Sequence, residues 1–219
     1  GFDLNIYLQQ LLKERFDSRK SLSDDRKKKE HKKLLQNSVK DKKVTKHISV
    51  DVRESLHLPF DKIGGWKIIQ NIKEKMCSVS QNFEKDSQKK NIKEFVLPDR
   101  SIITMSGKEI HSVPEALFNP SLCTKKNVEG IHSAVVHVLS KCDEFAKRLM
   151  CQNTILAGGG TLFDGIKTRL VSEVNTLAAK QNMDFGVNSK FKVDDPSDRK
   201  IASWVGGSIV ASLDSFKDL

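Results

Sequence analysis

The segment from residue 154 to residue 165 constrains the fold of this chain more than any other part of the sequence. An apolar run, Thr154-Ile155-Leu156-Ala157, ends in three successive glycines, and apolar residues then recur at helical spacing. We therefore expect a buried strand, a glycine turn and a helix, in that order. Because glycine has no Cβ, such a turn lets main-chain N–H groups approach a phosphate. The alternative is a tight connection between strand and helix that holds no ligand.

The sequence around these glycines does not match the phosphate loop of P-loop NTPases. Gly160-x4-Gly165 resembles the start of that motif, but Ile166-Lys167-Thr168 follow where it requires Lys and then Ser or Thr. The cysteines and histidines form neither a Cys-x-x-Cys pair nor a His-Glu-x-x-His motif, and no G-x-S-x-G elbow is present. The sequence therefore favours neither a metal site nor a self-contained hydrolase.

Length and composition indicate a folded intracellular protein. The chain has 219 residues, of which 37% are hydrophobic and 30% charged, enough for one large domain or two small ones with an apolar core. No apolar run approaches the roughly 18 residues of a membrane span. The four cysteines are too sparse to staple a domain of this size. We expect reduced thiols and no membrane contact.

Other elements follow from periodicity. Helices are predicted over residues 3–15 and from Trp66 to Phe83, and a hairpin from the runs FVLP and SIITM. A brief helical turn is expected between Pro114 and Pro120, and the run FKV is read as a short strand. For the last helix we expect a buried side that carries Ile201, Trp204, Val205, Ser208, Ile209 and Ser212. The pair Gly206-Gly207 inside that helix predicts close backbone packing against a neighbour.

The positive charge is concentrated in one segment. The formal net charge is +10, and residues 19–46 hold twelve Lys or Arg and four acidic residues, a net of +8. One interpretation is a solvated surface insertion. The other is a nuclear-localisation or polyanion-binding patch, densest at RKKKEHKK, because clustered lysines displace phosphate counterions. No aromatic residue interleaves these lysines, so sequence-specific binding of single strands is not expected.

Five stretches carry a family resemblance, in the family's order. They are GFDLNIYLQQLLKERF, IKEKMCSVSQNFEKD, FVLPDRSIITMSGKEIHSVPEALFNPSL, NTILAGGGTLFDGIKTRL and DRKIASWVGGSIVASLDSF. On these residues the chain resembles the C-terminal half of actin and the actin-related proteins. The resemblance covers nearly the whole chain except the region around residues 17–65.

The resemblance implies the ribonuclease H-like, actin-type ATPase fold, in which two lobes clamp ATP or ADP and a divalent cation, Mg²⁺ or Ca²⁺. Residues 1–127 are similar to the helical outer subdomain of one lobe, with a Lys-rich insertion at about 17–65. Residues 128–200 are similar to part of its inner sheet subdomain, and residues 201–219 to a helix that returns to the other lobe. Because the other lobe's phosphate loops are missing and the chain begins without Met, we expect a piece of a longer protein.

The resemblance also implies a nucleotide site, position by position. Gly1 would face the ribose side, Lys73 and Glu74 would contact the adenosine, and Lys200 would close the far side of the base. The remaining members are the phosphate-facing Gly158, Gly159 and Gly160, the adenine-flanking Leu162 and Phe163, and Gln70 near the base. Two of these positions depart from the family's usual residues, since Gln70 stands for an arginine and Gly160 for a threonine. Ala157, directly before the glycines, stands for a serine.

The function implied is a nucleotide-binding structural subunit of a multiprotein assembly, of which nuclear chromatin-remodelling complexes are one example. The alternative is a cytoskeletal actin-like protein that polymerises and hydrolyses ATP slowly. Expected partners are other protein subunits, with a weak nucleic-acid contact through residues 19–46. The expected location is the nucleus or the cytoplasm and cytoskeleton. The intact protein would be a slow ATPase at most, and this chain alone is not expected to be catalytic.

Overall fold

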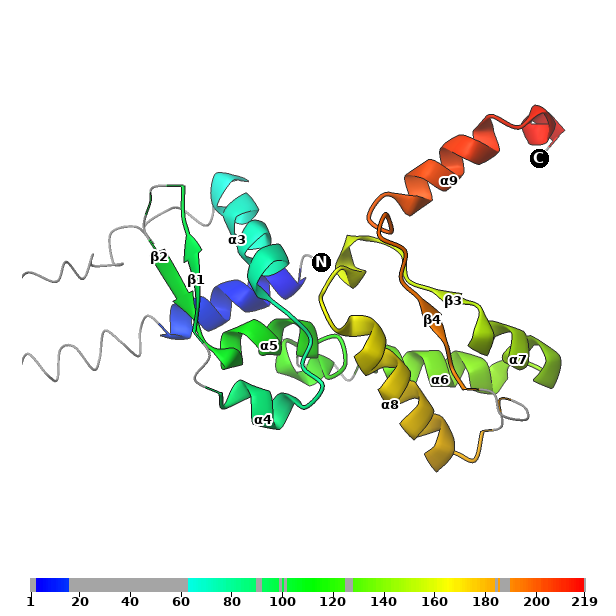
Figure 1. Cartoon of the computed structure of the whole chain (residues 1–219), viewed down its shortest axis with the longest axis horizontal. Coiled ribbons are helices and arrows are strands. Elements are labelled where there is room, and N and C mark those ends of the chain that lie inside the picture. Colours follow the sequence, from blue (N-terminus) through cyan, green and yellow to red (C-terminus); the bar gives the residue numbers. More distant parts are fainter. Residues whose placement is uncertain are drawn as a thin grey trace, which may run out of the picture.

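The computed structural model describes residues 3–15, 63–89, 92–98, 100, 102–124, 128–183, 185 and 190–218 (Figure 1). The Lys-rich segment 19–46, nearly all of the predicted insertion at 17–65 and the predicted site residue Gly1 lie outside the described residues. Within them the chain combines helices with two two-stranded sheets. This confirms the mixed α/β class.

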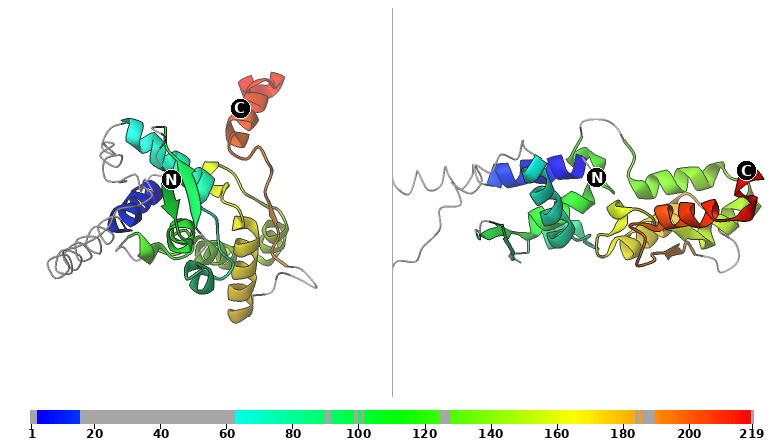
Figure 2. Two further views of the ribbon diagram at one scale, coloured as in Figure 1. Left: turned by 60° about the vertical axis from the view of Figure 1, so that its left-hand side comes forward. Right: turned by 90° about the horizontal axis from the view of Figure 1, so that it is seen from above.

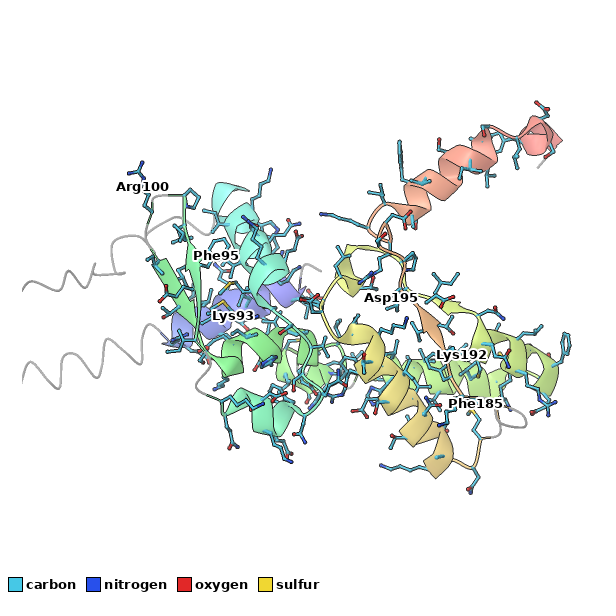
Figure 3. The ribbon with its side chains drawn as sticks, in the orientation of Figure 1. Lys93, Phe95, Arg100, Phe185, Lys192 and Asp195 are labelled. Carbon is cyan, nitrogen blue, oxygen red and sulfur yellow. The ribbon has the colours of Figure 1, made fainter. Side chains whose placement is uncertain are left out.

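The first group of elements surrounds the predicted hairpin. It contains the helix over residues 3–15, α3 (Ile63–Met76), α4 (Phe83–Ser87), β1 (Lys93–Val96), β2 (Ile102–Met105), α5 (Gly107–Glu115) and the short 3₁₀ turn η1 (Pro120–Leu122). Strands β1 and β2 pair antiparallel, with Phe95 opposite Ile103. Phe95 extends from β1 toward α3 (Figure 3), and it is buried together with Ile103 and Met105. One face of the hairpin thus forms part of the core.

The helix expected from Trp66 to Phe83 is shorter than predicted, because it ends at Met76. Val79, three residues after Met76, donates its N–H to the carbonyl of Asp164 (2.8 Å) and not to a carbonyl of the helix. Phe83 begins the separate helix α4, whose N-cap side chain is that of Asn82. A contact distant in sequence therefore overrides the helical spacing of the apolar residues.

Helix α5 lies earlier in the chain than the helical turn expected between Pro114 and Pro120. It begins after Ser106, where the side chains of Ser106 and Glu109 form a capping box. The capping box satisfies N–H groups that would otherwise lack partners at the helix N-terminus. Pro114 is not the first residue of a helix but lies near the end of α5.

The second group of elements surrounds the glycine turn. It contains α6 (Ile131–Lys141), α7 (Glu144–Gln152), β3 (Thr154–Ile155), the 3₁₀ turn η2 (Gly159–Thr161), α8 (Ile166–Lys180) and β4 (Val193–Asp194). Strands β3 and β4 are parallel, with Thr154 opposite Val193, so FKV contributes to a strand as predicted. Strand β3 is not buried throughout, because Ile155 is 64% exposed. The helix expected after the glycines is α8, which buries Leu170 and Val174.

Helix α9 (Ala202–Ala211) stands away from both groups, and the short turn η3 (Asp214–Asp218) follows it (Figures 1 and 2). The predicted buried side of this helix is wrong for this structure, since none of its residues is buried and Trp204 is 75% exposed. A Cβ added at Gly206 or Gly207 would meet no atom within 4 Å. The described residues provide no neighbour for the close packing that these glycines predicted.

The core is continuous across both groups of elements. It runs from Leu8 and Leu12 of the N-terminal helix, through Ile72 of α3 and Val113 of α5, to Val174 of α8. Among the helices that the structure describes, none is long and apolar enough to cross a lipid bilayer.

Candidate functional site

The glycine turn between β3 and α8 has an open main chain. Gly158 has a φ of 84°, a left-handed conformation that favours glycine. A Cβ added at Gly158 or Gly160 would meet no atom within 4 Å, and one at Gly159 would meet only the Lys200 side chain, at 3.9 Å. Apart from the Lys200 side chain, no described group outside the neighbouring residues lies near these Cβ positions, which leaves room for a ligand beside the backbone.

The far side of the turn is fixed by the segment that follows β4. Gly158 donates its N–H to the carbonyl of Arg199 (2.7 Å), and the Arg199 Nε donates to the carbonyl of Thr161 (3.3 Å). Thr161 in turn donates its hydroxyl to the Gly158 carbonyl (2.8 Å). These bonds place the exposed Lys200 beside Gly159, so the structure brings together this lysine and the three glycines.

An ion pair joins helix α8 to the segment that follows β4. Lys167, in the first turn of α8, lies 2.7 Å from the carboxylate of Asp195. The Lys167 hydrogen bond is the main reason that the pKa of Asp195 lies below its usual value. Figure 3 labels Asp195 between β4 and α9. Asp195 therefore links the start of α8 to the chain that carries Lys200.

The three predicted site residues of α3 lie on its last two turns. Gln70 donates its side-chain amide to the Glu74 carboxylate (2.8 Å), and both side chains are exposed. Lys73 is 9% exposed, and burial lowers the pKa of its ammonium group, although Glu74 opposes that shift. A lysine whose charge is partly desolvated gains from a polar or anionic neighbour.

The residues that end α3 and those that follow the glycine turn are joined directly. Ser78 and Asp164 form an isolated parallel bridge, in which the Val79 N–H donates to the Asp164 carbonyl. Leu162 is half-buried just before this bridge, whereas Phe163 is only 7% exposed and belongs to the core. Of the two residues predicted to flank the adenine, Leu162 thus lies at the surface of the turn, and Phe163 is part of the core.

Two residues of this region hold the glycine turn in place, and the sequence did not single them out. Arg199 and Thr161 fix the turn through the bonds given above. A signal existed for Arg199, which directly precedes the predicted Lys200. Thr161 follows the last glycine, and its hydroxyl could have been read as a local hydrogen-bond donor.

The described residues contain no cluster of three or more His, Cys, Asp or Glu side chains able to hold a metal ion. Cys77, one turn beyond Lys73, is buried, and burial raises the pKa of its thiol to about 12. It is therefore a thiol and not a thiolate at neutral pH.

The chain is an α/β protein with an open glycine turn between a strand and a helix and a lysine beside that turn, an arrangement that is suited to binding an anion. The family model described as actin matches residues 1–219, the whole of the chain. The chain belongs to the actin family. Members of this family generally bind ATP or ADP with a divalent cation, and they bind other proteins.

Proposed function

We propose that this chain supplies one side of an ATP- or ADP-binding site in an actin-related protein. The observation that carries the proposal is the open space in front of Gly158, Gly159 and Gly160 beside Lys200. Because the Gly158 N–H already donates to the Arg199 carbonyl, the N–H groups proposed to face the phosphates are those of Gly159 and Gly160. Backbone N–H groups and a lysine ammonium are the donors that a phosphate tail requires, and here no described side chain competes for the space.

The residues of α3 and of the turn would hold the nucleoside. Lys73 and Glu74 would contact the adenosine, and Gln70 would lie near the base. Leu162, backed by Phe163 from the core, would provide an apolar wall for the adenine ring. Gly1, outside the described residues, is proposed to complete the ribose side. A divalent cation would neutralise part of the charge on the phosphates.

We further propose that the protein is a structural subunit of a multiprotein assembly, in which nucleotide binding sets the closure between two lobes. In this proposal residues 1–127 are the outer subdomain, residues 128–200 part of the inner subdomain, and residues 201–219 a segment that packs on another lobe. The apolar, exposed surface of α9, with Trp204 and Ile209, supports a role in assembly. Nuclear chromatin-remodelling complexes are one setting that would suit the basic segment 19–46.

The test of nucleotide binding compares two glycines that both tolerate a Cβ. Gly159→Ala places a methyl group where the phosphates would approach, and Gly207→Ala places one on the exposed surface of α9. We expect the first variant to weaken ATP binding about tenfold or more, as for a loss of about 1.4 kcal/mol, and the second to bind like the parent. Isothermal titration with Mg²⁺-ATP measures both. Equal affinity in all three proteins would contradict the proposal.

The assembly role has its own tests. Sedimentation of the full-length protein with ATP and Mg²⁺ separates a complex subunit from a polymerising cytoskeletal protein, since abundant filaments in the pellet would support the latter. Deleting residues 19–46 tests the polyanion contact. If DNA affinity at low salt did not change, that contact would be abandoned.

A further inference from the structure

The two halves of the proposed nucleotide site come from different groups of elements, and residues 77–81 connect them. This segment leaves α3 and runs between α5 and the start of α8. On one side the Val79 N–H donates to Asp164, and on the other the His111 Nδ1 contacts the Ser78 carbonyl at 2.8 Å. We call residues 77–81 the connecting segment. The connecting segment directly follows α3, which carries Lys73, and it is hydrogen-bonded to Asp164, two residues after Leu162.

Pro114 creates one of the contacts of the connecting segment. Proline has no N–H, so it cannot donate to the carbonyl four residues earlier, that of Ile110. That carbonyl accepts a hydrogen bond from the Ser78 N–H instead (3.4 Å). The proline near the end of α5 therefore leaves an acceptor for the connecting segment.

Arg169 of α8 contacts both the connecting segment and α5. Its Nη1 donates to the Ser80 carbonyl (2.6 Å), and its guanidinium forms a bidentate pair with Glu115, with Nη1–Oε2 3.3 Å and Nη2–Oε1 3.2 Å. Its Nε donates to Glu173 (2.7 Å), and its Cζ lies 5.1 Å from the centroid of the Phe118 ring. One side chain thus joins α8, α5 and the connecting segment.

The burial of this pair makes the joint sensitive to substitution. The side chains of Arg169 and Glu115 are 12% and 9% exposed. Burial raises the pKa of Glu115, and the Arg169 charge opposes that shift. If Arg169 is removed, a carboxyl group is left in a poorly solvated place without its cation, and α5 and the connecting segment are expected to shift apart. A lysine would keep the charge but lose the planar fork.

We propose that Arg169 is a positioning residue for nucleoside binding: it holds Lys73 and Glu74 of α3 at the correct distance from Leu162 of the turn. The inference rests on the proposed nucleotide site. Arg169 is proposed to act on the nucleoside part of that site alone, because the phosphate part, the glycines and Lys200, is held by Arg199 and β4. Arg169 should therefore matter for the nucleoside and not for the phosphates.

The experiment uses the full-length protein, in which both sides of the site are present, with Arg169→Met, Arg169→Lys and the control Arg148→Met. Arg148 pairs with Glu144 at the surface of α7, where both side chains are about half exposed (52% and 53%). The ligands are Mg²⁺-ATP and inorganic tripolyphosphate, which shares the phosphates but lacks the nucleoside. Hydrogen exchange is measured without ligand at two amides. The Val79 N–H donates to the Asp164 carbonyl, and the Gly158 N–H donates to the Arg199 carbonyl.

We expect Arg169→Met to weaken ATP binding about tenfold while tripolyphosphate affinity stays within about twofold, a coupling of the size usual between linked sites. Val79 should exchange faster and Gly158 should not change. Arg169→Lys should recover part of both effects, and Arg148→Met should match the parent.

Two results would overturn the role of Arg169. One is an unchanged ATP affinity in Arg169→Met. The other is an equal loss of affinity for ATP and tripolyphosphate together with faster exchange at both Val79 and Gly158, because that result would indicate general destabilisation. A full-length parent protein that binds neither ligand would instead overturn the proposed nucleotide function. That outcome differs from the other two because it requires no variant.

Discussion

Arg15, the last described residue of the N-terminal helix, lies 3.2 Å from the Glu109 carboxylate in the first turn of α5, and the two side chains are 14% and 9% exposed. The same carboxylate accepts the Ser106 N–H (2.7 Å) and the Ser106 hydroxyl. Arg15 also donates to the carbonyl of Thr104 (2.6 Å). The helix that precedes the Lys-rich segment is therefore fastened to the point where β2 passes into α5.

This arrangement predicts a large effect of Glu109→Ala. The substitution removes the capping box of α5 and the largely buried carboxylate that pairs with Arg15, so the free energy of unfolding should fall by about 2 to 4 kcal/mol. Urea denaturation measures the change. The control Glu144→Ala removes the ion pairs of Glu144 with Lys147 and Arg148 on α7. It should cost less than about 1 kcal/mol, because the Glu144 carboxylate is 53% exposed. Equal effects of the two variants would contradict the structural role of Glu109.

Gly130, which precedes α6, predicts a steric effect. A Cβ at this position would overlap the carbonyl oxygen of Phe118. Because that acceptor is main chain and cannot move aside cheaply, Gly130→Ala should destabilise the protein by about 2 to 4 kcal/mol. Gly206→Ala on α9 has open space around it and should be neutral or stabilising by up to about 1 kcal/mol. Thermal or urea denaturation compares them, and a tolerated Gly130→Ala would show that this contact is absent in solution.

His132, in the first turn of α6, predicts a pH dependence of stability. Burial lowers the pKa of its imidazole, with Glu173 opposing and Arg169 adding to the shift. Its Nδ1 is buried and has no hydrogen-bond partner among the described residues. Because the native pKa lies below the unfolded value of 6.5, the unfolded state binds more protons as the pH falls below that value, and stability is lost.

The measurement is the free energy of unfolding between pH 7.5 and about 5 for His132→Gln and the parent. The parent should lose more stability toward low pH than the variant, whose side chain does not titrate. Parallel curves for His132→Gln and the parent would show that His132 does not contribute.

The sequence predicts best where local patterns decide the structure. The hairpin follows from two β-prone runs around Pro98, and the apolar spacing after the glycines predicts α8. The openness of the glycine turn also follows from residue type, since no Cβ projects from it. Ser106 and Glu109 carry a readable capping box, so the start of α5 could have been predicted as well.

The sequence fails where distant contacts decide. The end of α3 at Met76 depends on Asp164, and no local feature of residues 77–83 reveals that partner. The burial of Lys73 and the bidentate pair of Arg169 with Glu115 are tertiary properties, and each residue looks like an ordinary surface charge in the sequence. The positions that hold the site together are therefore less visible than the glycines that form it.

The apolar residues of helix α9 are exposed in this chain, so replacing them should have little effect on stability. Trp204 is 75% and Ile209 58% exposed, so Trp204→Lys and Ile209→Lys remove no buried contact among the described residues. The free energy of unfolding should stay within about 0.5 kcal/mol of the parent value. Leu8→Ala, which empties a fully buried position of the N-terminal helix, should cost about 2 to 5 kcal/mol in the same urea titration. A loss above about 1 kcal/mol for either lysine variant would mean that α9 packs against the rest of the chain in solution, contrary to its position in Figure 1.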